Sequence, residues 1–164
     1  MKTYIKNILV NTVLLSTTAL VSLNTAFAQE KETAVKNMVE SKNFVFKAQT
    51  MNPMTGRTRQ LTSEYDLKIL KDSIIAYLPY FGRAYSPPVN PNEGGIQFTS
   101  TDFEYKMTVR KKGGWDIQIK PKDARDVRQL DLSVFKNGSA TLGVNSNNRQ
   151  SISFNGHVED PTVR

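Results

Sequence analysis

The sequence predicts a mainly β protein, an antiparallel meander of about eight strands that forms a barrel or a strongly curved sheet, lipocalin-like in general shape, with one N-terminal α-helix. Apolar and polar residues alternate along most of residues 43–155, which is the period of a strand with one buried face. The pairs Gly113-Gly114 and Asn137-Gly138 each separate two alternating runs and are typical of tight hairpin turns. Only residues 29–42 show helical spacing. We therefore expect one β domain led by a single helix.

Residues 1–28 have the composition of a secretory signal peptide. Lys2 and Lys6 precede an apolar stretch, and Ala26-Phe27-Ala28 is a small-residue signal for cleavage after Ala28. The apolar stretch is too short and too polar to span a membrane comfortably. The chain contains no cysteine, which excludes a lipoprotein anchor, a thiolate nucleophile and a disulfide framework. The sequence thus predicts a periplasmic protein with a cleaved leader, no lipid anchor and no membrane span.

The charge of the mature chain is mildly basic. The formal net charge of the full sequence is +7, and two of these charges belong to Lys2 and Lys6 of the leader. The rest are scattered among acidic residues, which suits solubility, and attraction to anionic lipid headgroups or acidic glycans is the alternative. Nucleic acid is not an expected partner of an exported protein. We expect a monomer whose stability comes from its hydrophobic core.

The predicted helix covers residues 29–42. Its apolar residues recur at spacings of three and four: Ala34, Val35, Met38 and Val39. Acidic residues near its start suit the helix dipole, and Lys42-Asn43 ends it.

The first strands follow this helix. Residues 44–48 alternate, residues 52–56 form a turn, and residues 61–70 alternate again, which predicts a hairpin. Residues 74–78 are apolar at successive positions and predict a central strand buried on both faces. The segment 79–95 contains four prolines and three glycines, so it cannot pair regularly in a sheet.

The second half of the chain contains the remaining strands of the single β domain expected at 43–155. They are expected at residues 96–98, 103–109, 115–120, 130–134, 140–144 and 150–154. Residues 156–164 are expected to form a loose C-terminal tail.

An aromatic segment in the proline-rich loop is the candidate ligand-binding site. Its rings offer flat apolar faces for an acyl chain or a sugar, and its arginine can pair with a carboxylate or phosphate or stack on a ring. The expected ligand-binding residues are Tyr80, Phe81, Arg83, Tyr85 and Trp115. The alternative is that these rings plug the open end of the barrel. A barrel filled by side chains and without a cavity would exclude a ligand in its mouth.

Groups for catalysis or metal binding are scarce. His157 is the only histidine and falls in the expected tail, so a catalytic triad would need an ordered tail that reaches a serine. One histidine without cysteine is short of the usual zinc ligands. Aspartates 123, 126 and 131 are interleaved with basic residues, so solvated ion pairs are a better interpretation than a calcium site. We expect no catalytic residue, no metal and no cofactor.

A carboxylate-based hydrolase is the remote alternative. Five carboxylates lie on or beside predicted strands: Glu64, Asp66, Asp102, Glu104 and Asp116. Strand parity places Glu64, Asp66 and Glu104 on the solvent side, where no desolvation raises the pKa of an acid.

Four sequence strings, together with the leader, carry a family resemblance: Phe44-Val45-Phe46, Leu78-Pro79-Tyr80-Phe81-Gly82-Arg83-Ala84-Tyr85, Gly94-Gly95-Ile96-Gln97-Phe98 and Lys112-Gly113-Gly114-Trp115. Over residues 40–155 the chain resembles domain-of-unknown-function family 4251, small exported proteins of Bacteroidetes. The resemblance implies a Gram-negative periplasmic setting and supplies no activity.

Two functions fit these observations. The first is a non-catalytic binding module for an apolar or amphipathic small molecule, lipid or glycan, held in the barrel mouth. The second is a structural or interaction protein of the envelope that contacts another protein or the cell wall through a strand edge or the aromatic loop.

Overall fold

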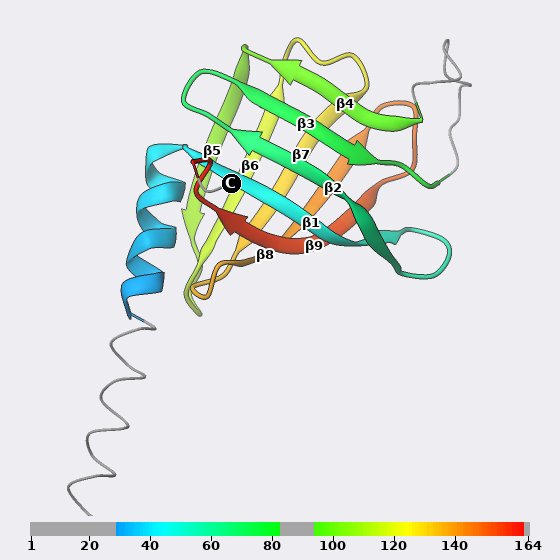
Figure 1. The fold of residues 1–164 in the computed structure, drawn as a ribbon. Coiled ribbons are helices and arrows are strands. Elements are labelled where there is room, and N and C mark those ends of the chain that lie inside the picture. The colour runs from blue at the N-terminus through cyan, green and yellow to red at the C-terminus, as the bar shows by residue number, and fades with distance from the viewer. Residues whose placement is uncertain (1–28, 83–93, 163–164) are drawn as a thin grey trace, which may run out of the picture.

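The computed structural model describes residues 29–82 and 94–162. The predicted leader and the middle of the aromatic loop lie outside the described residues. Nine strands form one antiparallel sheet that curls into a nearly closed barrel, shown in Figure 1. The strands are β1 (Phe44–Pro53), β2 (Arg59–Ile69), β3 (Ile74–Pro79), β4 (Gly95–Ser100), β5 (Phe103–Val109), β6 (Trp115–Pro121), β7 (Val127–Val134), β8 (Ser139–Ser146) and β9 (Ile152–Glu159). The predicted fold class is confirmed, with nine strands rather than about eight.

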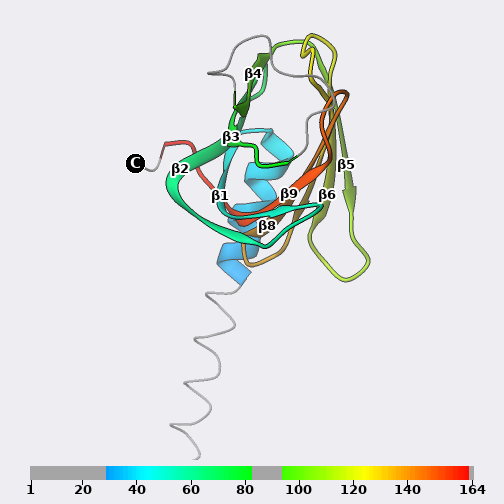
Figure 2. The same cartoon turned by 90° about the vertical axis from the view of Figure 1, so that its right-hand side faces the viewer.

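The sheet order is β4-β3-β2-β1-β9-β8-β7-β6-β5. Chain neighbours pair as hairpins, and the ladder between β1 and β9 joins the two halves of the chain. The sheet therefore ends at β4 and β5, which follow each other in sequence but do not pair with each other. Figure 2 shows these two edge strands diverging from their short connection. We call the open side between the edge strands the seam.

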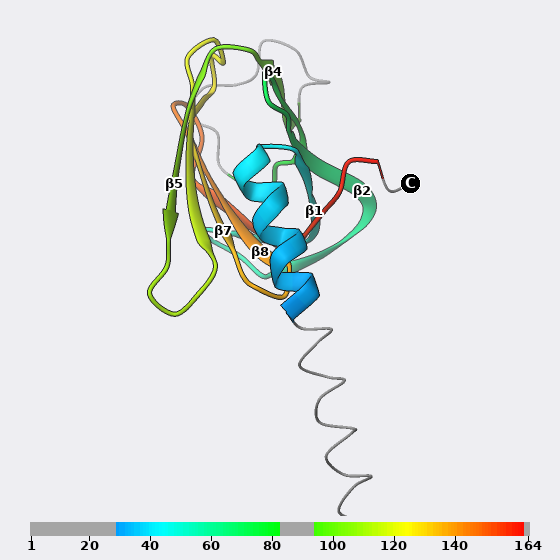
Figure 3. The same ribbon diagram turned by 90° about the vertical axis from the view of Figure 1, so that its left-hand side faces the viewer.

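The N-terminal helix covers residues 29–41 and packs across an open side of the barrel, as Figure 3 shows. Val35 and Val39 are buried against the core. The hydroxyl of Tyr105 on β5 donates a hydrogen bond of 3.1 Å to the carbonyl oxygen of Val39. Lys42 ends the helix with a φ of 53°, in the left-handed region. No helix in the described part of the chain is both long and apolar enough to span a membrane.

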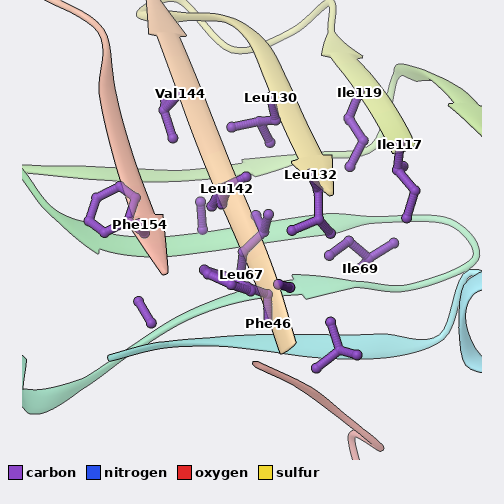
Figure 4. Packing of buried hydrophobic residues seen from close by; sticks show 14 of the residues in the cluster. Phe46, Leu67, Ile69, Ile117, Ile119, Leu130, Leu132, Leu142, Val144 and Phe154 are labelled. Atoms are coloured by element: carbon purple, nitrogen blue, oxygen red, sulfur yellow. The ribbon is translucent and has the colours of Figure 1, made fainter. Parts of the chain in front are cut away.

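Side chains fill the interior of the barrel. Figure 4 shows residues from opposite walls that point toward one another, among them Phe46, Leu67, Leu132 and Phe154, and each of these is at most 1 % exposed. Burial of one such side chain stabilises the fold by roughly 1.5–3 kcal/mol. The interior is thus a packed core.

The outer face of β3 differs from the prediction. Ile74, Ala76 and Leu78 are buried, whereas Ile75 is 36 % and Tyr77 48 % exposed. A barrel strand has only one face on the core, so apolar residues at successive positions cannot all be buried. The ring of Tyr77 stacks on that of Tyr65 with 5.7 Å between centroids.

The predicted start of the C-terminal tail at residue 156 is wrong. β9 continues to Glu159, because residues 156–159 pair with residues 45–48 of β1. Gly156 allows this approach, since a Cβ at this position would clash with the carbonyl oxygen of Lys47. His157 consequently lies on a strand, and its Nε2 is 3.6 Å from a carboxylate oxygen of Glu159.

Candidate ligand-binding site at the barrel seam

The predicted site residues do not form one cluster. Tyr80 and Phe81 follow β3 at the end of the barrel that carries the β8–β9 connection, where the Tyr80 hydroxyl donates to the carbonyl oxygen of Gln150 at 3.2 Å. Trp115 is 5 % exposed and pairs with Val134 beside the β7–β8 turn, at the other end of β8. It is a core residue, away from Tyr80. Arg83 and Tyr85 lie outside the described residues.

The two described aromatic residues of the loop have different surroundings. Tyr80 packs against the hydrophobic core, as the plug interpretation expects. Phe81 is 50 % exposed, and the guanidinium of Arg59 lies 4.9 Å from the centre of its ring. Of these two residues, Phe81 is therefore the one that presents a large apolar face to solvent.

Arg149, in the β8–β9 connection, contacts three segments beside the seam: β4, the connection from β6 to β7, and the residues that follow β3. Its side chain is only 11 % exposed. Its Nη1 donates to the carbonyl oxygen of Gly95 on β4 at 2.8 Å, and its Nη2 lies 3.9 Å from a carboxylate oxygen of Asp126. The guanidinium also lies 5.1 Å from the ring centre of Tyr80. An arginine in a polar turn carries no sequence signal for burial, so sequence reasoning missed it.

A cavity of about 260 Å³ lies between β4 and the connection from β6 to β7. We call it the seam pocket, lined by Gly95, Ile96, Gln97, Phe98, Ala124, Arg125, Asp126, Val127, Ser146 and Arg149. Ile96 and Val127 are each 4 % exposed and form an apolar floor. Arg125 and Asp126 of the connection and Ser146 of β8 line the pocket beside this floor. Its volume is just below the range of small-molecule sites, which starts at about 300 Å³.

Hydrogen bonds hold the charged wall of the seam pocket. The carbonyl oxygen of Arg125 accepts a hydrogen bond of 3.1 Å from the side-chain amide of Asn147, and the backbone N–H of Asn147 donates to the carbonyl oxygen of Asp126 at 3.0 Å. The Arg125 side chain is exposed and forms no ion pair with any residue in the described ranges. The wall therefore presents one arginine whose charge is not compensated by an ion pair with a described residue.

A larger hollow of about 750 Å³ lies on the outer face of β1, β2 and β9. Residues 61–64 of β2 have no partner in β1, because the register jumps from Ala48↔Tyr65 to Thr50↔Gln60. In this hollow the ammonium of Lys47 lies 3.4–3.8 Å from three carboxylates, those of Glu64, Asp66 and Glu159. Three carboxylates thus share one ammonium on the outer face of the sheet.

The candidate acids of a hydrolase are likewise exposed or paired. Glu64 is 93 % exposed, and Glu104, 63 % exposed, lies 3.4 Å from Lys122. Asp66 is only 16 % exposed, yet it is 3.4 Å from the ammonium of Lys47. None of these three is the buried, unpaired carboxyl that serves as a general acid.

The three aspartates considered for a calcium site, Asp123, Asp126 and Asp131, have separate partners. Asp123 accepts hydrogen bonds from the backbone N–H groups of Thr101 and Asp102 at 2.9 and 3.3 Å. Asp126 lies beside Arg149, and Asp131 accepts from the side-chain amide of Gln129 at 2.7 Å. Within residues 29–82 and 94–162 no cluster of three metal-binding side chains forms.

Comparisons with known proteins agree with this fold. The model of a family described as "Domain of unknown function (DUF4251)" matches residues 26–158. The crystal structure of a DUF4251 family protein from Bacteroides eggerthii has a TM-score of 0.57 and 16 % sequence identity, over 82 % of this chain and 89 % of that chain. At this identity the similarity concerns the fold. No curated protein matches the chain.

Proposed function

The chain belongs to the DUF4251 family, whose description names no activity, and from this premise we propose that it is a non-catalytic binding module for an amphipathic small molecule. The observation that supports this function is the seam pocket, where an apolar floor meets a charged wall. Because side chains fill the barrel interior, the proposed site lies at the seam and not in the barrel mouth. The leader pattern of residues 1–28 supports export to the periplasm.

The seam pocket suits a ligand with an apolar and a polar part. The floor formed by Ile96 and Val127 contributes about 0.8 kcal/mol for each methylene group that it removes from water. The polar part remains at the wall, where Ser146 and Arg125 provide hydroxyl and guanidinium groups. Such a site binds by burial and hydrogen bonding and needs no reacting group.

Native mass spectrometry of residues 29–164, purified from the periplasm of the natural host, tests the function. We expect an added mass that disappears on denaturation. Ala124→Trp places a large ring at the pocket wall and should abolish the added mass. Ile75→Trp adds the same ring on the exposed face of β3 and should keep it. A protein without added mass in its native state would contradict the proposal.

An envelope interaction module is the second candidate. The exposed side chains of Ile75 and Tyr77, with the stacked ring of Tyr65, form an apolar area on the outer face of β2 and β3. Capture of an envelope protein by the wild type, lost in Tyr77→Lys and kept in Ala124→Trp, would favour this function over ligand binding.

A further inference from the structure

We infer that the ligand of the seam pocket is a single-chain amphiphile with one oxyanionic head group, which pairs with the guanidinium of Arg125. This inference rests on the proposed function and specifies the ligand class.

The charges of the pocket select the sign of the head group. Among the described residues, two arginines and one aspartate line it: Arg125, Arg149 and Asp126. Arg149 already donates to Gly95 and lies beside Asp126, whereas Arg125 forms no ion pair with a described residue. The described lining residues therefore carry one positive charge in excess, and a single negative charge on the ligand compensates it.

The geometry of a guanidinium favours an oxyanion over other anionic groups. Its planar N–H donors match two oxygens of a carboxylate or phosphate at once. Hydrogen bonds from Asn147 hold the carbonyl oxygens of Arg125 and Asp126, so the backbone that carries the Arg125 side chain is fixed beside the apolar floor. The floor and the guanidinium then contact the two ends of one ligand.

Three probes with the same alkyl chain distinguish the contribution of the head group to the affinity from that of the chain: octanoate, octanol and octylamine. Each is titrated into the mature chain, residues 29–164, with the affinity measured by calorimetry and the location by amide chemical shifts. We expect octanoate to bind about tenfold more tightly than octanol, which is the effect of one charge-assisted contact at a partly exposed site. Octylamine should bind most weakly, and the shifts should centre on Ile96 and Val127.

A pair of arginine variants tests the assignment to Arg125. Arg125→Gln should lower the affinity for octanoate about tenfold and leave that for octanol unchanged. Arg128→Gln is the matched control, because Arg128 is exposed on β7 and does not line the pocket. Its affinities should equal those of the wild type.

The outcomes distinguish this inference from the proposed function. If octanoate and octanol bind at the pocket with equal affinity, or octylamine binds best, the head-group inference fails and the binding function stands. If no probe binds and the host-purified protein carries no added mass, both fail. Octanoate binding that is centred away from Ile96 and Val127 also overturns the inference.

Discussion

The Nη1 of Arg149 donates a hydrogen bond of 2.8 Å to the carbonyl oxygen of Gly95, which ties the β8–β9 connection to the edge strand β4. Edge strands expose backbone groups that can pair with other chains. The side chain of Arg149 covers part of this edge from within the molecule and forms one wall of the seam pocket. The contact thus links the stability of the seam to the shape of the proposed site.

Arg149→Met should destabilise the protein by about 1–3 kcal/mol, because the half-buried carbonyl of Gly95 loses a charged donor and the carboxylate of Asp126 loses its ion pair. Urea unfolding measures this loss. Arg128→Met removes an exposed arginine from β7 and should change stability by less than about 0.5 kcal/mol. Equal stability of the two variants would show that the Arg149 contacts contribute nothing to the fold.

Gly156→Ala should destabilise the protein by about 3 kcal/mol or more, because its Cβ would meet the backbone of β1 and the ladder would have to shift. Gly143→Ala is the matched control within the same sheet. A Cβ there lies 3.7 Å from its nearest neighbour, the carbonyl oxygen of Asp131. We expect this control to be neutral or stabilising by up to about 1 kcal/mol. Thermal unfolding measures the stability of both variants. A Gly156→Ala protein as stable as the wild type would contradict the β1–β9 register.

Burial of Tyr105 raises the pKa of its hydroxyl. The unfolded chain therefore ionises this group first, at about pH 10, and stability should fall as the pH rises above that value. Tyr105→Phe removes this loss of stability at alkaline pH and also the hydrogen bond to Val39, which contributes about 1 kcal/mol. Urea unfolding at about pH 8 and pH 11 should show a smaller loss in the variant than in the wild type. Parallel losses would mean that Tyr105 ionises as easily in the folded state.

Hydrogen bonds hold the pKa of Asp123 below its usual value, first that from the Ser100 hydroxyl and then that from the backbone N–H of Thr101. A carboxyl with a lowered pKa contributes stability above its unfolded pKa of about 3.9, and this contribution is lost as the pH falls through the lower, folded value. Asp123→Asn should flatten the acid limb of the stability profile. The same acid limb in both proteins would contradict a role for this carboxylate at the β4–β5 connection.

Local patterns predicted the elements that depend on neighbours in sequence. The helix at residues 29–41 follows from spacings of three and four, and Gly113-Gly114 and Asn137-Gly138 lie at the turns that they predicted, with positive φ at Gly113, Gly114 and Gly138. The resemblance to the DUF4251 family, which rested on short strings, is confirmed by the match over residues 26–158.

The sequence alone therefore determined the β class, the leading helix and the hairpins, because each depends on hydrogen bonds and side-chain periods within a few residues. The tertiary structure decided that β9 pairs with β1 up to Glu159, that Tyr80 and Trp115 lie at different ends, and that Arg149 is buried beside the seam pocket. These features join residues that are far apart in the chain. They depend on how the sheet curls and where it stops, which no local period specifies.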